Sequence, residues 1–223
     1  MGTSTRRIGA ALLLGAAGVL WLTLAAGGAA AASNSAGAST GKSHRAAAAA
    51  HWRVDAARST LGFATVKNAA VGEGHQFTRV SGDISATGLA SLSIDLASVD
   101  TGIEIRDQRI RELLFEVARF PQARVETQVD LADVLKLAPG QSMLMPLELR
   151  LHVREGDTTL GATVRVERLS ATRVLVTTVR PVIVNADALG LTEGVERLRH
   201  IAGLQSISPA VPVSMVLAFR LAR

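Results

Sequence analysis

The stretch LELRLHVR, residues 147–154, alternates strictly between apolar and polar side chains. Successive side chains of a β-strand point to opposite faces, so this period of two gives the segment one dry face and one wet face. Strands of that kind are typical of antiparallel sheets that cover a core on one side only. The stretch therefore predicts a strand of an all-β domain.

The same alternation recurs along the chain. It is clear in residues 92–96, 125–131, 164–167 and 213–221. Further strands are expected at 53–57, 60–67, 78–87 and 173–184. About eight such strands in one domain predict a closed antiparallel barrel or a sandwich.

Two segments have a helical period instead. In residues 106–117 the apolar side chains fall on one helical face, which is formed by Ile110, Leu113, Leu114 and Val117. Phe120-Pro121 ends the segment. A second short helix is expected at 194–202, with Val195, Leu198 and Ile201 facing inward. Both would be helical insertions in loops between strands.

The N-terminal 50 residues differ from this domain. Arg6-Arg7 precede an uncharged run from Ile8 to Ala32 that ends in small residues, which predicts a secretory signal peptide or, because of its length, an uncleaved N-terminal anchor. Residues 33–50 are rich in Ser, Gly and Ala and predict a flexible linker. The barrel domain is then expected to occupy residues 51–223, outside the cytoplasm.

Charge and composition exclude some function classes. The chain carries 24 basic and 19 acidic residues, but four of the basic ones lie in residues 1–50, which hold no acid. The rest is almost neutral, and five Phe, two Trp and no Tyr leave few surfaces on which bases could stack. Nucleic-acid binding is therefore not expected. The absence of cysteine excludes disulfides and thiolate metal sites.

The triplet Asp100-Thr101-Gly102 is the strongest enzyme-like motif, because aspartic proteases present a catalytic carboxylate in such a triplet. That chemistry needs two carboxylates sharing one proton, and the chain has one such triplet. We interpret Asp100 and Gly102 as the turn that ends a strand. A hydrolase using Asp100 stays a minor alternative.

The histidines do not form a metal-binding pattern. No two of the five lie at a metal-ligand spacing. His75, with Glu73, falls in a Gly-rich segment that reads as a loop, where the pair could bind a metal or a head group but is more simply solvated. No catalytic residue, metal or cofactor is predicted.

The charged run from Arg106 to Glu112 admits two interpretations. It is either a solvated helix face, or it includes a buried arginine that fixes the loop to the barrel. Asp100 and Asp107 are the expected partners of Arg106 in the second case.

Several of these residues together resemble the YceI-like family. The matching segments are WRVD at 52–55 with Ser59 and Phe63, SVDTG at 98–102, RD at 106–107, LF at 114–115 and FPQA at 120–123. The resemblance implies a lipocalin-like, eight-stranded antiparallel barrel in the periplasm. It also implies a long polyisoprenoid, such as a quinone tail or a polyprenyl lipid, held inside the barrel for transport or storage, with no enzymatic activity.

The inward strand faces and this resemblance together predict a ligand pocket. Helix 106–117 is expected to close one end, with membrane contact through lipid exchange or the N-terminal segment. The pocket is expected to be lined by Phe63, Ile94, Leu96, Leu114, Phe115, Phe120, Leu149, Val166, Met215, Leu217 and Phe219. The alternation alone fits an ordinary packed core equally well, so a membrane-tethered interaction module with a packed barrel stays open.

Overall fold

A computed structural model describes residues 51–222. The segments interpreted as a signal or anchor, residues 1–32, and as a linker, residues 33–50, lie outside the described residues. None of the helices within residues 51–222 has the length and apolar character needed to cross a membrane.

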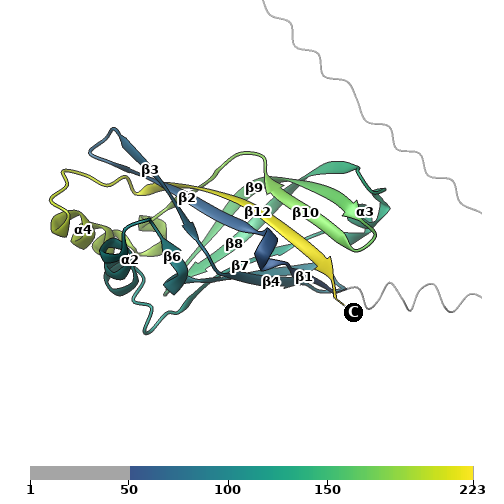
Figure 1. Cartoon of the computed structure of the whole chain (residues 1–223), viewed down its shortest axis with the longest axis horizontal. Coiled ribbons are helices and arrows are strands. Elements are labelled where there is room, and N and C mark those ends of the chain that lie inside the picture. Colours follow the sequence, from purple (N-terminus) through teal and green to yellow (C-terminus); the bar gives the residue numbers. More distant parts are fainter. Residues whose placement is uncertain (1–50, 223) are drawn as a thin grey trace, which may run out of the picture. The chain divides into compact units, whose positions relative to one another are not determined.

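The described chain is a single antiparallel sheet that closes on itself (Figure 1). Its strands are β1 (Trp52–Val54), β2 (Thr60–Lys67), β3 (Val71–Phe77), β4 (Val80–Ile84), β5 (Leu89–Asp95), β6 (Val99–Asp100), β7 (Gln122–Gln128), β8 (Ser142–Val153), β9 (Gly156–Ser170), β10 (Arg173–Thr178), β11 (Val182–Asn185) and β12 (Ala210–Leu221).

Four pairs of these segments each form one interrupted strand, so the barrel has eight. The pairs are β1 with β2, β3 with β4, β5 with β6, and β10 with β11. The two members of each pair are consecutive in the chain and hydrogen-bond to the same neighbouring strand of the barrel. Consecutive strands are neighbours throughout, and the last strand, β12, pairs back onto β1 and β2. This is an up-and-down barrel without a free edge, which confirms the predicted lipocalin-like, all-β fold.

Three α-helices interrupt the strands within the described residues. They are α2 (Glu104–Arg109), α3 (Leu131–Lys136) and α4 (Thr192–Ile201). The predicted helix 106–117 is real but begins earlier, as α2, and continues as a π-helical turn, η3 (Ile110–Leu114). It ends at Glu116, whose positive φ of 49° cannot continue a right-handed helix. The predicted helix 194–202 corresponds to α4, but Ile201 is 47% exposed rather than inward.

Two segments differ from the sequence-based expectation. Residues 72–76, interpreted as a loop, lie within strand β3. Gly72 and Gly74 supply outward positions without side chains, while Glu73, His75 and Phe77 face inward. The strand expected at residues 125–131 ends earlier, as β7 at Gln128, and Leu131 begins α3 instead. The Asp130 carboxylate accepts a hydrogen bond from the Ala132 amide at 2.9 Å and caps that helix.

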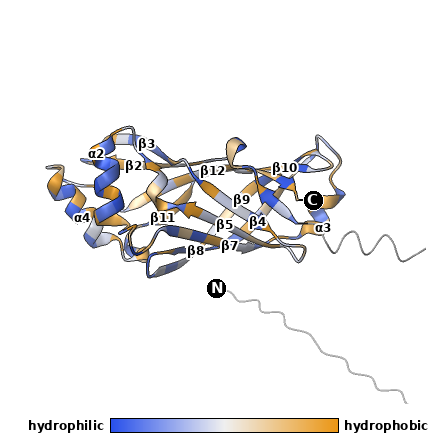
Figure 2. Ribbon diagram, turned by 60° about the horizontal axis from the view of Figure 1, so that its bottom comes forward, coloured by the Kyte–Doolittle hydropathy of each residue, from blue (hydrophilic) through white to orange (hydrophobic). Residues whose placement is uncertain are grey.

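One end of the barrel is packed solid. There the Arg168 guanidinium lies over the Trp52 ring at 5.3 Å and donates to the carbonyl oxygens of Ser170 and Ala171 at 2.7 and 2.8 Å. Val174, Leu217 and Phe219 are buried in the same region. Apolar and polar residues alternate along the strands in the way that the sequence pattern predicts (Figure 2). The opposite end carries α2 and α4 (Figure 1).

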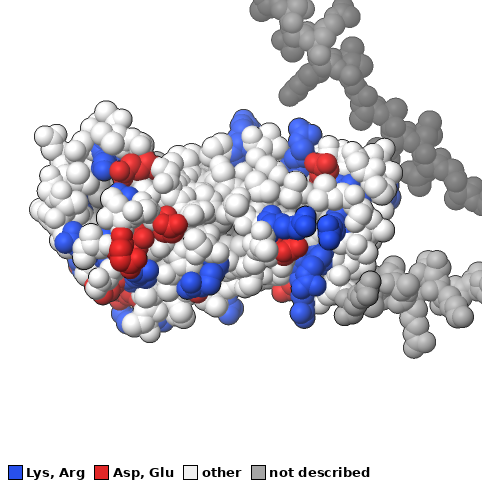
Figure 3. Space-filling model, viewed as in Figure 1, with Lys and Arg blue, Asp and Glu red and all other residues white. Residues whose placement is uncertain are grey.

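Charge is dispersed over the surface. Figure 3 shows lysine and arginine interspersed with aspartate and glutamate on the displayed face, separated by uncharged residues. No large area of this face carries charge of only one sign, so its electrostatic potential is weak, as the nearly neutral composition of the domain predicts.

Candidate functional site

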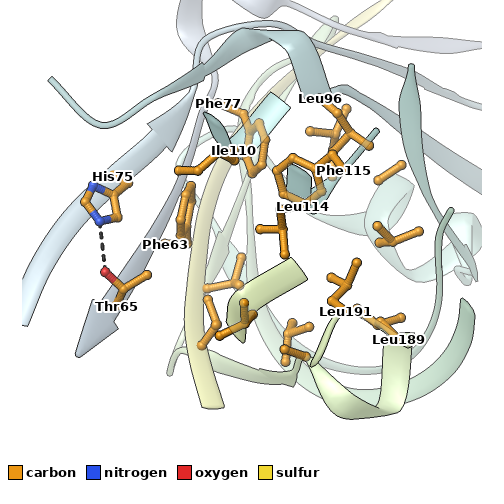
Figure 4. Close-up of a pocket in the computed structure, with 18 of the residues that line it drawn as sticks. Phe63, Thr65, His75, Phe77, Leu96, Ile110, Leu114, Phe115, Leu189 and Leu191 are labelled. Atoms are coloured by element: carbon orange, nitrogen blue, oxygen red, sulfur yellow. Dashed lines mark hydrogen bonds between the residues drawn. The ribbon is translucent and has the colours of Figure 1, made fainter. Parts of the chain in front are cut away.

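The helix-bearing half of the barrel encloses a cavity of about 460 Å³. That volume lies in the range of about 300–1,000 Å³ typical of small-molecule sites. Its wall is largely aliphatic and aromatic and comes from nearly every strand, from α2, η3 and α4 (Figure 4). Besides the residues discussed below, it includes Leu61, Leu92, Ala123, Val125, Leu151, Val153, Leu160, Val182, Val184, Leu189, Leu191, Leu204, Ile207, Val211 and Val213. The cavity is therefore large enough for a small molecule and offers it a mainly apolar wall.

The helices cover the open end of this cavity. Leu114 from η3 and Val195 and Leu198 from α4 all line it. The two elements approach closely at Gly194, where a Cβ atom would lie 2.9 Å from the Leu113 carbonyl oxygen and 2.9 Å from Leu114 Cδ1. Glycine at position 194 therefore lets α4 seat on η3 and complete the cover.

Gly194→Val is expected to lift α4 from η3 and to lower the free energy of unfolding by about 1–3 kcal/mol, as other overpacked contacts do. Hydrogen exchange of the α4 amides should accelerate more than that of the β-strands. Thr192→Val, an exposed position in the same helix, is the control and should change neither quantity. Equal protection of α4 in both variants would contradict this role of Gly194.

Seven of the eleven predicted pocket residues line the cavity. They are Phe63, Ile94, Leu96, Leu114, Phe115, Leu149 and Met215. Figure 4 shows Phe63, Phe77, Leu114 and Phe115 gathered around the same space, with Ile110 drawn near Phe77 and Leu96 near Phe115. The three phenylalanine rings form a series. The ring centroids of Phe63 and Phe77 lie 5.3 Å apart, and those of Phe77 and Phe115 lie 6.0 Å apart.

The other four predicted residues lie elsewhere. Val166, Leu217 and Phe219 have inward side chains but belong to the packed half, where they are 4, 4 and 8% exposed. Phe120 is half-buried beneath the guanidinium groups of Arg119 and Arg154, at 4.9 and 5.6 Å from its ring centroid. These four do not line the cavity, and we do not propose them as ligand contacts.

A polar strip interrupts the apolar wall along β2 and β3. The register pairs Thr65 with Glu73 and Phe63 with His75, and Lys67 lies nearest the hairpin turn. Along the inward faces the side chains therefore change from charged to neutral polar and then to aromatic. Such a gradient suits an amphipathic ligand whose polar end lies toward the β2–β3 turn.

Arg106 joins this strip from α2, and its partner differs from the expected one. Its guanidinium pairs with Glu73 at 2.8 Å, and it donates to the Thr101 hydroxyl and carbonyl oxygens at 2.7 Å each. Glu73 also accepts from Lys67 at 2.9 Å. The expectation of an Arg106 pair with Asp100 or Asp107 was wrong, because β3 was interpreted as a loop and could not be placed beside α2.

The two aspartates hold the turn before α2. Asp107, only 5% exposed, accepts hydrogen bonds from the Thr101 amide, at 3.0 Å, and from the Thr101 hydroxyl. Asp100 accepts from the Gly102 amide at 2.9 Å and from Gln76 at 3.0 Å. The Gln76 hydrogen bond, reinforced by the Gly102 amide, lowers the pKa of Asp100. Its partners are an amide side chain and a backbone group, as a structural turn requires.

His75 is the functional candidate whose position the sequence did not predict. Its Nε2 lies 2.9 Å from Thr65 Oγ1, its ring lies 5.2 Å from that of Phe63, and it lines the cavity. Burial lowers the pKa of His75, and the charge of Arg106 lowers it further. The imidazole is therefore neutral at neutral pH. The alternation of Glu73, His75 and Phe77 with Gly72, Gly74 and Gln76 was the signal for its inward placement.

The lowered pKa values predict how stability depends on pH. A histidine whose pKa is depressed in the folded state takes up its proton more readily when unfolded, so stability falls as the pH drops below about 6.5. The pKa of Glu73 is lowered mainly by its hydrogen bond from Lys67, and its contribution is lost only at lower pH, below about 4.5. Arg106, Lys67, Glu73 and Asp107 are the charges acting on His75.

His75→Gln is therefore expected to flatten the decline in melting temperature between about pH 7 and 5.5. The decline below about pH 4.5 should stay. Thermal unfolding measured from about pH 7 to below pH 4.5 gives the decline in both pH ranges. An unchanged slope above pH 5.5 in the variant would contradict the assignment to His75.

Comparisons with known proteins agree with this geometry. A polyisoprenoid binding domain from Saccharophagus degradans, implicated in plant cell wall breakdown, is 40% identical, with a TM-score of 0.75 over 77% of this chain and 98% of that one. BcnA of Burkholderia cenocepacia is 18% identical, with a TM-score of 0.58 over 74% and 98%, which supports the fold alone. No curated protein matches the sequence.

The sequence model of the YceI-like domain matches residues 52–219, which is nearly the whole described barrel. It covers the strands that close the barrel and the helices that cover its cavity. The resemblance inferred from the short motifs is thereby confirmed, and the chain belongs to the YceI-like domain family.

Proposed function

We propose that this protein binds a long-chain polyisoprenoid lipid, a quinone or a polyprenyl lipid, inside the barrel and carries or stores it. The observation that carries the proposal is the apolar cavity of about 460 Å³ closed by α4 and η3. The similarity to the polyisoprenoid binding domain of Saccharophagus degradans supports the class of ligand.

The chemistry of the wall favours a hydrocarbon chain. A polyprenyl tail carries few polar atoms, so it needs a dry tube rather than hydrogen-bond partners along its length. Each CH₂ group taken from water contributes about 0.8 kcal/mol, and a five-carbon unit therefore about 4 kcal/mol. Phe63, Leu114, Phe115, Leu149 and Met215 are the proposed contacts of the tail.

The proposal extends to where the protein works. The cationic start and uncharged run of residues 6–32 support export to the periplasm or cell envelope, cleaved or anchored. Lipid would then be exchanged with a membrane. Intact mass of the protein from cells distinguishes removal of the N-terminal segment from its retention as an anchor.

Equilibrium binding of polyprenols of increasing length tests the function. Affinity should rise steeply with each added isoprene unit and level off once the cavity is full, because further units stay in water. A series in which affinity is independent of chain length would contradict burial of the tail. The alternative of a membrane-tethered interaction module requires a packed interior, which the cavity disfavours. We do not propose a hydrolase centred on Asp100, because its hydrogen-bond partners are Gln76 and Gly102.

A further inference from the structure

The cavity reaches the protein surface beside the C-terminal end of α4. Ala202 is exposed to solvent and also lines the cavity, and Leu204 and Ile207 continue the same wall. Lys67 lines the cavity from the last position of β2. The mouth of the cavity therefore lies between the segment that follows α4 and the turn between β2 and β3. Figure 1 shows α4 and this turn at the same end of the barrel.

Hydrogen bonds hold these two segments side by side. The Asn68 amide donates to the Ser206 carbonyl oxygen at 2.9 Å, and the Asn68 side-chain oxygen accepts from the Gln205 amide at 2.8 Å. Lys67 and Ile207 pair as a single antiparallel β-bridge. The two segments therefore present one continuous surface around the mouth of the cavity.

This surface, which we call the mouth rim, consists of residues 68–72 and 201–206. Their sequences, NAAVG and IAGLQS, contain no charged side chain. Val71 and Ile201 are 46 and 47% exposed, and neither side chain lines the cavity. The rim thus presents aliphatic side chains to solvent directly beside an apolar cavity. Exposed apolar surface of this kind marks sites of contact with proteins or membranes.

The charged groups that flank the rim are paired within the protein. Lys67 donates to Glu73 at 2.9 Å. Arg199 donates to Glu196 at 2.7 Å and to the Leu204 carbonyl oxygen at 2.9 Å. A partner recognised through charge would have to displace these contacts. The rim therefore suits an apolar partner without net charge, such as the interfacial region of a neutral bilayer.

The proposed cargo favours a bilayer over a protein as this partner. A polyisoprenoid tail is a membrane component, and every CH₂ group that enters water raises the free energy of transfer. The apolar rim continues into the cavity wall at Ala202 and Leu204. A tail that passes along this surface from a bilayer into the barrel stays in contact with apolar groups.

Building on the proposed function, we propose that the mouth rim docks on the surface of a neutral phospholipid bilayer, and that the isoprenoid passes between bilayer and cavity at this place. Val71 and Ile201 enter the boundary between head groups and acyl chains, where binding grows with the apolar area that is buried. The packed end of the barrel then faces away from the docked bilayer surface.

A fluorescent label tests the docking itself. The chain has no cysteine, so a single introduced cysteine can carry one environment-sensitive fluorophore. With the label at Val71→Cys or Ile201→Cys, the emission should shift to shorter wavelength when phosphatidylcholine vesicles are added. Leu144→Cys is the matched control, because Leu144 is 53% exposed and lies on β8 beside the packed half of the barrel. A shift at Leu144 without one at Val71 and Ile201 would place the contact elsewhere and overturn the proposal.

The rate of lipid uptake tests the role of docking. Ile201→Asp should slow the uptake of polyprenol from phosphatidylcholine vesicles about tenfold, the effect of losing one buried apolar side chain. The affinity for a short polyprenol added without vesicles should stay unchanged, because Ile201 does not line the cavity. Leu144→Asp should change neither quantity. Added salt should leave the rate unchanged, since the rim carries no charge to screen.

The outcomes separate this proposal from the proposed function. If the unmodified protein takes up no polyprenol from vesicles or from solution, the lipid-binding function fails, whatever the fluorophores show. If polyprenol binds but Ile201→Asp and Leu144→Asp take it up equally fast, docking through the rim is wrong although lipid binding stands. Uptake that requires anionic lipid and slows with added salt would also contradict the proposal, because it would show contact through charged groups.

Discussion

Met215→Trp is expected to remove lipid binding while the barrel stays folded. Met215 lies on β12 and faces the cavity, so an indole at this position projects into empty space. Excluding a single five-carbon unit of the tail costs about 4 kcal/mol, which corresponds to close to a thousandfold in affinity. Because the ring occupies a void rather than displacing packed side chains, the melting temperature should change little.

Ser214→Trp is the matched control for this change. Ser214 precedes Met215 on the same strand, is exposed, and faces the outside of the barrel. It should bind polyprenol as the unmodified protein does. Titration of both variants with polyprenol measures the difference. Equal affinity in the two variants would show that the ligand does not occupy this cavity.

Asp107→Ala is expected to destabilise the fold by about 2–4 kcal/mol. The buried carboxylate accepts from the Thr101 amide and hydroxyl, and its loss leaves that amide unpaired beside the Arg106 guanidinium. For a domain of this size the melting temperature should fall by roughly 5–12 °C. Thermal unfolding by circular dichroism measures this shift.

Asp100→Asn provides the comparison within the same turn. Its carboxylate is exposed, and an asparagine oxygen can still accept from the Gly102 amide. The melting temperature of this variant should stay near that of the unmodified protein. A larger loss from Asp100→Asn than from Asp107→Ala would mean that the roles of the two aspartates are reversed.

The barrel could be predicted from sequence because its strands have one wet and one dry face. Alternation in residues 147–154 and 213–221 corresponds to β8 and β12. The alternation pattern did not predict the structure correctly where glycines took the place of polar side chains, or where a helix cap favoured a helix over a strand. Gly72 and Gly74 concealed β3, and the Asp130 cap places Leu131 in α3 although this residue continues the alternation of β7.

The site was less predictable, because alternation shows which face is inward but not how far along the barrel the interior is filled. Met215 and Leu217 share one face of β12, yet only Met215 lines the cavity. The Arg106 partnership with Glu73 depends on two segments 33 residues apart meeting at one end of the barrel. That contact follows from the closure of β3 against β6 rather than from any local motif.

The most direct test of the account is what the protein carries when it is purified from cells. Native mass spectrometry, followed by solvent extraction and identification of the released lipid, should show one long-chain isoprenoid per barrel. Met215→Trp should yield the same protein without it, and Ser214→Trp should retain it. A barrel that emerges without lipid and takes up no polyprenol when it is offered would contradict the central claim.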